Sequence, residues 1–137
     1  MPEFVLDASA TLAMCFPDES TAWSEALLEQ VRKAAAIRVP AHWPIEVANG
    51  LWSGIRRKRI DENQAQLLWN AFSLLKIYPE SPLSASESAA LVQLAFKHGL
   101  TVYDAAYLDL AIKRQLPLAT LDADLRKAAA RATVTIL

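Results

Sequence analysis

Four acidic residues occupy comparable places along the chain. They are Asp7 in "FVLDASATL", Glu46 in "VPAHWPIEVANGL", Asp104 in "TVYDAAYLDLA" and Asp122 in "LPLATLDADL". Carboxylates about 4 Å apart repel by roughly 4 kcal/mol per pair at an effective dielectric near 20. If the four converge, they take up protons or bind a cation. Oxygen ligands select Mg²⁺ or Mn²⁺, and the set lacks the cysteine and histidine typical of zinc sites.

Each acid, taken singly, also has a purely structural interpretation. Asp7, Asp104 and Asp122 precede helical stretches, where aspartate is a favoured N-cap worth about 1 kcal/mol. Glu46 is harder to explain in this way, because it lies in a largely apolar turn with Ile45 where an unpaired carboxylate is costly. A surface position on an amphipathic helix remains open for it.

The elements that would position these acids alternate between strand and helix. Strand-like segments are 4–6, 37–39, 77–78, 118–120 and 134–136, and helical stretches are 21–36, 43–58, 62–75, 85–98, 104–115 and 123–131. The strands are short and apolar without alternation, as in a parallel sheet covered on both faces. This order predicts a three-layer α/β fold. Because the carboxyl ends of parallel strands meet at one edge, the four acids are expected at one rim.

Length and composition narrow the class of protein. The 137 residues, 53% hydrophobic and without linkers or repeats, predict one domain spanning 1–137. No apolar run is long enough to span a bilayer, and no secretory signal is recognised. The single cysteine, Cys15, fits a reducing cytoplasm, which is the expected location.

Charge and glycine content exclude two modes of binding. Fourteen basic and fifteen acidic residues give a net charge of −1, so any binding of nucleic acid must be local rather than global. Gly50, Gly54 and Gly99 are the only glycines, and they are not spaced as in a phosphate-binding loop. Nucleotide binding of the Rossmann or P-loop kind is therefore not expected.

Several polar residues are assigned positions away from the predicted acidic site. His42 is interpreted as part of a turn before Trp43, and His98 as the end of a helix, where it favours the C-terminal dipole. Neither is expected to act as a catalytic base. Asp109 lies about 140° further round its helix than Asp104 and is expected off the site.

With these motifs in order, the chain resembles a PIN-domain ribonuclease, and more narrowly a VapC-type toxin of a toxin–antitoxin pair. The likeness extends over essentially the whole length and rests on "FVLDASA", "VPAHWPIEVANGL", "TVYDAAYLDLA" and "LATLDADL". The resemblance implies a five-stranded parallel sheet flanked by helices. It also implies an acidic pocket that binds Mg²⁺ or Mn²⁺ and cleaves RNA internally.

The resemblance also assigns roles to the acids. It makes Asp7, Glu46, Asp104 and Asp122 the catalytic residues. Asp7 and Asp104 hold the metal, while Glu46 and Asp122 contribute directly or through water. Ser9 matches a small hydroxyl position that contacts Asp7 or the scissile phosphate. A further acid, Asp124, is either a group behind these ligands or a charge in the first turn of the last helix.

Substrate and protein partners follow from the same likeness. The one dense basic run, Arg56, Arg57, Lys58 and Arg59, is a candidate for contacts with the RNA backbone, although cations at a helix C-terminus also complement the dipole. The resemblance implies a homodimer and a cognate VapB-type antitoxin that silences the enzyme by placing a basic side chain among the acids. No membrane association is expected.

Two other readings remain open. One is another acidic-site α/β enzyme, such as an aspartate-based phosphatase or a phosphotransfer domain. A phosphatase of that kind would place a second aspartate two positions after Asp7, where this chain has Ser9. The other is a nuclease-like fold that only binds, and the four intact acids argue against it.

Overall fold

A computed structural model of the chain describes residues 2–137, and its centre is a parallel sheet in the order β3-β2-β1-β4. The strands are β1 (Glu3–Leu6), β2 (Ala36–Val39), β3 (Ile77–Pro79) and β4 (Leu118–Ala119). Phe4 is paired with Ile37 on one side of β1, and Val5 with Leu118 on the other. Because β1 lies inside the sheet, its carboxyl end opens onto the middle of the sheet edge.

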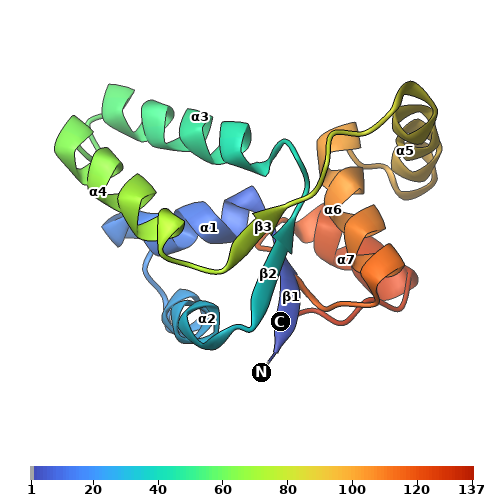
Figure 1. Ribbon diagram of the computed structural model, residues 1–137, viewed down its shortest axis with the longest axis horizontal. Coiled ribbons are helices and arrows are strands. Elements are labelled where there is room, and N and C mark those ends of the chain that lie inside the picture. The colour runs from blue at the N-terminus through green and yellow to red at the C-terminus, as the bar shows by residue number, and fades with distance from the viewer. Residues whose placement is uncertain (1) are drawn as a thin grey trace.

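Helices cover both faces of this sheet, as the strand–helix alternation predicts. They are α1 (Ala8–Cys15), α2 (Ala22–Lys33), α3 (Trp43–Arg56), α4 (Glu62–Ser73), α5 (Ala85–His98), α6 (Val102–Arg114) and α7 (Ala123–Arg131), with a short 3₁₀ turn, η1 (Pro17–Glu19), after α1. Figure 1 shows α1 to α4 on one side and α5 to α7 on the other. Within residues 2–137, no helix has the length and apolarity needed to cross a membrane.

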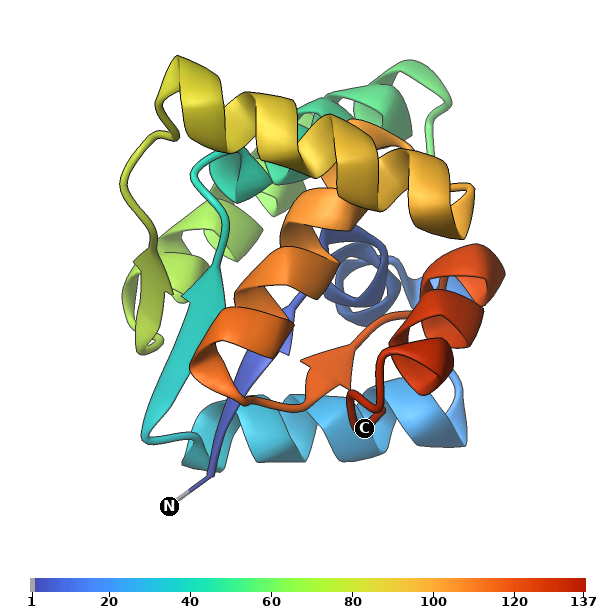
Figure 2. The same ribbon diagram turned by 90° about the vertical axis from the view of Figure 1, so that its right-hand side faces the viewer.

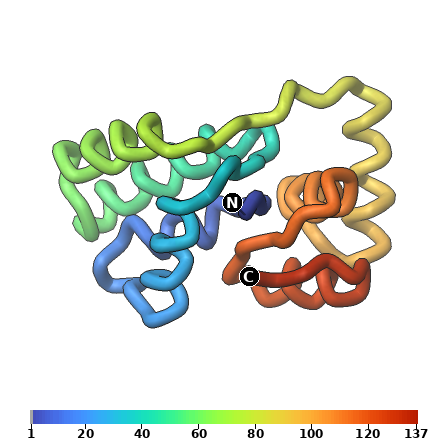
Figure 3. The backbone as a smooth tube through the Cα atoms, turned by 60° about the horizontal axis from the view of Figure 1, so that its bottom comes forward, coloured from blue at the N-terminus to red at the C-terminus, as the bar shows by residue number. Residues whose placement is uncertain are grey.

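The two helical layers come from consecutive halves of the chain. Figure 3 shows the blue-to-green half and the yellow-to-red half lying on either side of the central strands. Viewed from the second face, α6 crosses directly over the sheet between α5 and α7 (Figure 2). The strands are brief and apolar because both faces are buried: Phe4, Val5, Leu6, Ile37 and Val39 are each at most 1% exposed.

The expected fifth strand is reduced to a single bridge. Leu118 pairs with Ile136 in parallel, the Leu118 N–H donates to the Thr135 carbonyl at 2.8 Å, and no further pair is formed in the described chain. The prediction of five strands is therefore wrong, because the sheet has four strands. The reason is that β4 has only two residues, so it offers too little backbone for a ladder of several pairs.

Helix α3 packs against α1 and the residue that follows it through a face that carries two glycines. A Cβ atom on Gly50 would overlap the end of the Leu12 side chain, and one on Gly54 would lie 2.5 Å from the Phe16 ring. This close approach fixes α3 against the helix that follows β1. It therefore sets where the first turn of α3 stands relative to Asp7.

Candidate active site

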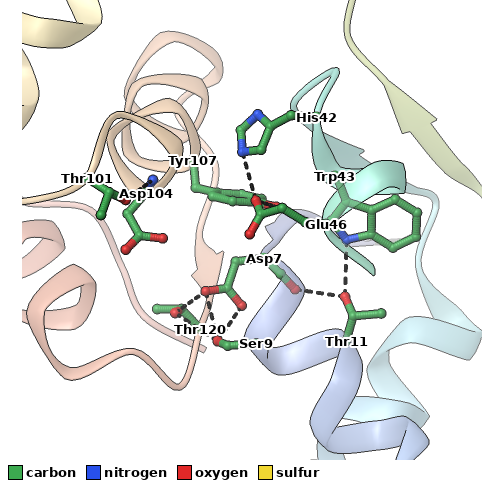
Figure 4. A network of polar contacts seen from close by, with 10 residues as sticks. All are labelled: Asp7, Ser9, Thr11, His42, Trp43, Glu46, Thr101, Asp104, Tyr107 and Thr120. Carbon is green, nitrogen blue, oxygen red and sulfur yellow. Dashed lines mark hydrogen bonds and ion pairs between the residues drawn. The ribbon is translucent and has the colours of Figure 1, made fainter. Parts of the chain in front are cut away.

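The four predicted acids gather at the edge where β1 and β4 end and several helices begin. Asp7 is the N-cap of α1, Glu46 and Asp104 lie in the first turns of α3 and α6, and Asp122 is the N-cap of α7. Figure 4 shows the carboxylates of Glu46 and Asp104 turned toward Asp7. The convergence predicted from the sequence is thus present in the fold.

Asp7 is both a helix cap and the most buried of the acids, at 2% exposure. Its Oδ1 accepts a hydrogen bond of 2.8 Å from the Ala10 amide. The Ser9 hydroxyl donates to the same carboxylate at 2.8 Å, and the Thr120 hydroxyl donates to Oδ2. Asp7 therefore caps α1 and also belongs to the acidic site. The expected contact between Ser9 and Asp7 is confirmed.

Burial dominates the electrostatics of Asp7. Loss of hydration raises the pKa of Asp7 from 3.8 to about 6, although hydrogen bonds from Thr120, Ala10 and Ser9 oppose the change, and the charge of Asp104 adds a little to it. The carboxylate is therefore held ionised at neutral pH at a cost in free energy. A bound cation would lower that cost.

Asp104 is not a helix cap, which corrects the structural interpretation given above. The helix begins at Val102 rather than at Asp104, and the Thr101 hydroxyl accepts from the Asp104 amide at 3.1 Å. Partial burial and the charges of Asp122 and Glu46 raise the pKa of Asp104. Its carboxylate is thus free of capping and subject to repulsion from the other acids.

Glu46 has two partners that the sequence analysis did not place in the site. The Tyr107 hydroxyl donates to Glu46 Oε1 at 2.9 Å, and His42 Nε2 lies 2.9 Å from the same oxygen. The interpretation of His42 as lying outside the site is therefore wrong. Burial and the charge of Glu46 raise the pKa of Tyr107, so the hydroxyl remains a protonated donor.

Thr120 is a further residue that sequence reasoning missed. It is fully buried, and besides its contact with Asp7 its hydroxyl accepts from the Asp122 amide at 3.0 Å. Asp122 Oδ1 in turn accepts from the Leu125 amide at 2.8 Å, which confirms the capping interpretation for this acid. Asp124 is exposed in the first turn of α7, beside the site.

Asp109 and His98, which were also expected to lie off the site, do so. Asp109 forms an ion pair with Lys113 at 2.8 Å along the surface of α6. His98 ends α5, where its Nδ1 accepts from Arg131 at 3.3 Å. Neither residue contacts the four acids.

The basic run is not brought to the acids. Ten residues of α3 separate Glu46 from Arg56, which corresponds to about 15 Å along the helix axis. Arg59 is bound by Asp18 and Glu19 and covers the Phe16 ring at 4.0 Å. Arg56, Arg57 and Lys58 are exposed, and no acid in residues 2–137 forms an ion pair with them.

The donor chemistry of the acidic site suits a hard divalent cation. All four acids offer carboxylate oxygens, and two of them have raised pKa values. In the part of the chain that the structure describes, no three acidic, histidine or cysteine side chains are close enough to enclose an ion as they stand. The fit to Mg²⁺ or Mn²⁺ therefore rests on the kind of donor.

Known proteins resemble this chain in sequence and in fold. Residues 4–131 match the family described as PIN domain. The chain is 37% identical over 127 residues to Ribonuclease VapC3 of Pyrobaculum aerophilum, an alignment that covers 90% of this chain and 92% of the relative.

Three solved structures share the architecture. PAE2754 from Pyrobaculum aerophilum superposes with a TM-score of 0.67 and 27% identity, covering 93% of this chain and 79% of the other. FitAcB from Neisseria gonorrhoeae gives 0.61 and 20%, covering 98% and 96%. VapBC2 from Rickettsia felis, bound to a DNA fragment from their promoter, gives 0.62 and 19%, covering 98% and 97%.

Proposed function

The chain belongs to the PIN domain family and is a VapC-like member of it; from this premise we propose that it is a metal-dependent endoribonuclease, the toxin of a toxin–antitoxin pair. The observation that carries the proposal is the gathering of Asp7, Glu46, Asp104 and Asp122 at one sheet edge. Within residues 2–137, no lysine or arginine forms an ion pair with any of the four. Acids collected without a cation are expected where a metal ion binds.

Asp7 and Asp104 would hold the ion, Mg²⁺ or Mn²⁺, with Glu46 and Asp122 contributing directly or through water. When bound, the ion supplies positive charge that offsets the negative charge of the phosphodiester and of the transition state. Glu46 would orient the attacking water and draw off its proton. We expect the water to attack phosphorus and the P–O3′ bond to break, with O3′ leaving and taking up a proton, so that the products are a 5′-phosphate and a 3′-hydroxyl; the RNA 2′-hydroxyl is not the nucleophile.

The protein partners are part of the same proposal. The VapC-like character of the chain supports a cognate VapB-type antitoxin, and an unpaired acidic site is a natural receptor for a basic side chain of such an inhibitor. Large exposed apolar side chains support a homodimer, among them Ile45 at 71% and Phe96 at 90% exposure. RNA would enter at the acidic edge of the sheet.

The decisive experiment compares wild-type protein with Asp7→Asn on structured RNAs in Mg²⁺ or in EDTA. Wild type in Mg²⁺ is expected to cut RNA, and both EDTA and the substitution should reduce the rate by at least about 100-fold. Cleavage that survives both changes would overturn the metal-dependent mechanism. Phosphatase activity without nuclease activity would favour the aspartate-based phosphatase instead.

A further inference from the structure

Two side chains from opposite helical layers meet on one oxygen of Glu46. His42 stands at the start of α3, on one side of the sheet, and Tyr107 is on α6, on the other (Figure 4). Both lie 2.9 Å from Glu46 Oε1. The second carboxylate oxygen has no hydrogen bond within residues 2–137, and Figure 4 shows it turned toward Asp7.

The position of His42 is unusual for the start of a helix. Of the seven α-helices in the described chain, α3 is the one whose N-cap side chain accepts no hydrogen bond from the helix. A serine, threonine, aspartate or asparagine there would satisfy a free amide. His42 instead turns its ring toward Glu46, one helical turn further on. The contact with Glu46 thus takes the place of a side-chain hydrogen bond that would cap α3.

The imidazole is held by its surroundings. Its ring packs against Tyr107 at 5.1 Å in an edge-on arrangement and against Tyr103 at 5.4 Å. Its Nε2 atom is buried and is not aligned for a hydrogen bond with any group in residues 2–137. Glu46 Oε1 lies 2.9 Å from this nitrogen. An N–H at this position would reach that carboxylate oxygen after a small rotation of the ring or of the carboxylate.

We propose that His42 and Tyr107 are positioning residues, a clamp that occupies Oε1 of Glu46 and leaves the other oxygen directed into the acidic site. The inference rests on the proposed function. Tyr107 lies three residues after Asp104 on α6, so one helix supplies both an acid and the donor that fixes the acid of α3. The clamp thus couples the two layers across the ends of the strands.

The test uses a matched pair of tyrosines. Tyr107→Phe removes the hydroxyl on Glu46, whereas Tyr103→Phe removes one that forms no hydrogen bond in the described chain although its ring also packs on His42. With RNA in Mg²⁺, Tyr107→Phe should lower kcat about 10-fold or more with KM within about 2-fold, and Tyr103→Phe should leave both unchanged. Titration calorimetry of Mn²⁺ without RNA should show weaker binding by about 10-fold only for Tyr107→Phe.

A second pair of variants tests the imidazole. His42→Leu should reproduce the losses in kcat and Mn²⁺ affinity, and His42→Gln, which restores an N–H donor, should recover most of both. Equal effects of Tyr107→Phe and Tyr103→Phe, or of the Leu and Gln variants, would overturn the clamp and indicate general packing. Because Mn²⁺ affinity is read without RNA, a wild type that fails to cut RNA would overturn the proposed function while the clamp is still judged.

Discussion

The two ends of α3 carry opposite charges and differ in how those charges are neutralised. At its start, Glu46 lies with Asp7 and Asp104; burial, and to a lesser extent the charge of neighbouring acids, raises the pKa values of Asp7 and Asp104. Just after its end, Arg59 is bound by Asp18 and Glu19, with its Nε 2.9 Å from Asp18 Oδ2. The carboxylates at the start of α3 repel one another, whereas the charge of Arg59 is already neutralised by acids of the same fold.

This contrast distinguishes a ligand-binding site from a structural ion pair. A charge that the fold pairs internally stabilises the fold, and its removal costs stability. A charge that the fold leaves unpaired and buried destabilises it, and the cost is tolerated where a ligand will pair with it. Removing a charge should therefore change stability in opposite directions at the two ends.

Asp7→Asn should give the largest effect. In EDTA at pH 7.5 we expect the free energy of unfolding to rise by up to about 3 kcal/mol, because about two pH units separate the pKa of about 6 from the ordinary 3.8. Urea unfolding measures this change. A variant that is inactive and less stable than wild type would show that Asp7 contributes to the fold as well as to the site.

The same shift fixes the sign of the pH dependence. Between pH 4 and 6 the unfolded carboxyl of Asp7 is ionised while the folded one is still protonated, so the unfolded state binds fewer protons. Wild-type stability in EDTA should therefore fall as pH rises through this window, and saturating Mg²⁺ should restore it at pH 7.5. Asp7→Asn is the control, since this part of the pH dependence should vanish in it.

Gly54→Ala should have the next largest effect, about 1–3 kcal/mol of destabilisation. The new methyl group would meet the buried Phe16 ring, whose face is covered by the guanidinium of Arg59, so the ring has little room to move. Gly50→Ala is the matched control on the same face of α3. It meets the end of the Leu12 side chain, which can rotate, and it gains helix propensity.

Thermal unfolding of the two alanine variants tests this difference. We expect a lower Tm for Gly54→Ala and a change within a few degrees for Gly50→Ala. Equal Tm losses would indicate that α1 and α3 are packed too tightly for any side chain, flexible or not. RNA cleavage by Gly50→Ala should then also fall, because Glu46 lies one turn away on the same helix.

Features that depend on interactions between residues close together in the sequence could be predicted, whereas features that depend on distant residues could not. The parallel sheet and the caps at Asp7 and Asp122 were predictable, because apolar runs and capping preferences act within a few residues. The convergence of the acids followed from the shared edge of parallel strands. Thr101 was missed as the cap of α6, so the helix was predicted to begin two residues late.

The residues that contact the acids, His42, Tyr107 and Thr120, were harder to predict from the sequence. Sixty-one positions separate Tyr107 from Glu46, and their contact depends on how the two layers meet. Signals were present: His42 lies four residues before Glu46, and Tyr107 three after Asp104, both helical spacings. Thr120 is two residues before Asp122, where an alternating strand end returns a side chain to the same face.

Arg59→Gln should cause a smaller loss of stability than Gly54→Ala. It removes the pairing with Asp18 and Glu19 and part of the cover over Phe16. The Arg59 guanidinium lowers the pKa of Asp18, so the stabilisation is present at neutral pH and fades as pH falls below the ordinary aspartate value of 3.8. Urea unfolding at low and high salt measures it, with exposed Arg57→Gln as the control that should change little.

The smallest effect is expected where charge at the end of α3 is exposed and unpaired. If Arg56, Arg57 and Lys58 contact the RNA backbone, replacing all three with glutamine should leave the Tm unchanged and lower RNA affinity. Each lost phosphate contact with single-stranded RNA should reduce the slope of log K against log salt by about 0.7. Binding is best measured on Asp7→Asn protein, in which RNA cleavage should be at least about 100-fold slower. Arg59→Gln should leave that slope unchanged, because its charge is already taken by Asp18 and Glu19. A slope that falls equally for Arg59 and for the exposed three would show that pairing within the fold does not separate structural from substrate-binding cations here.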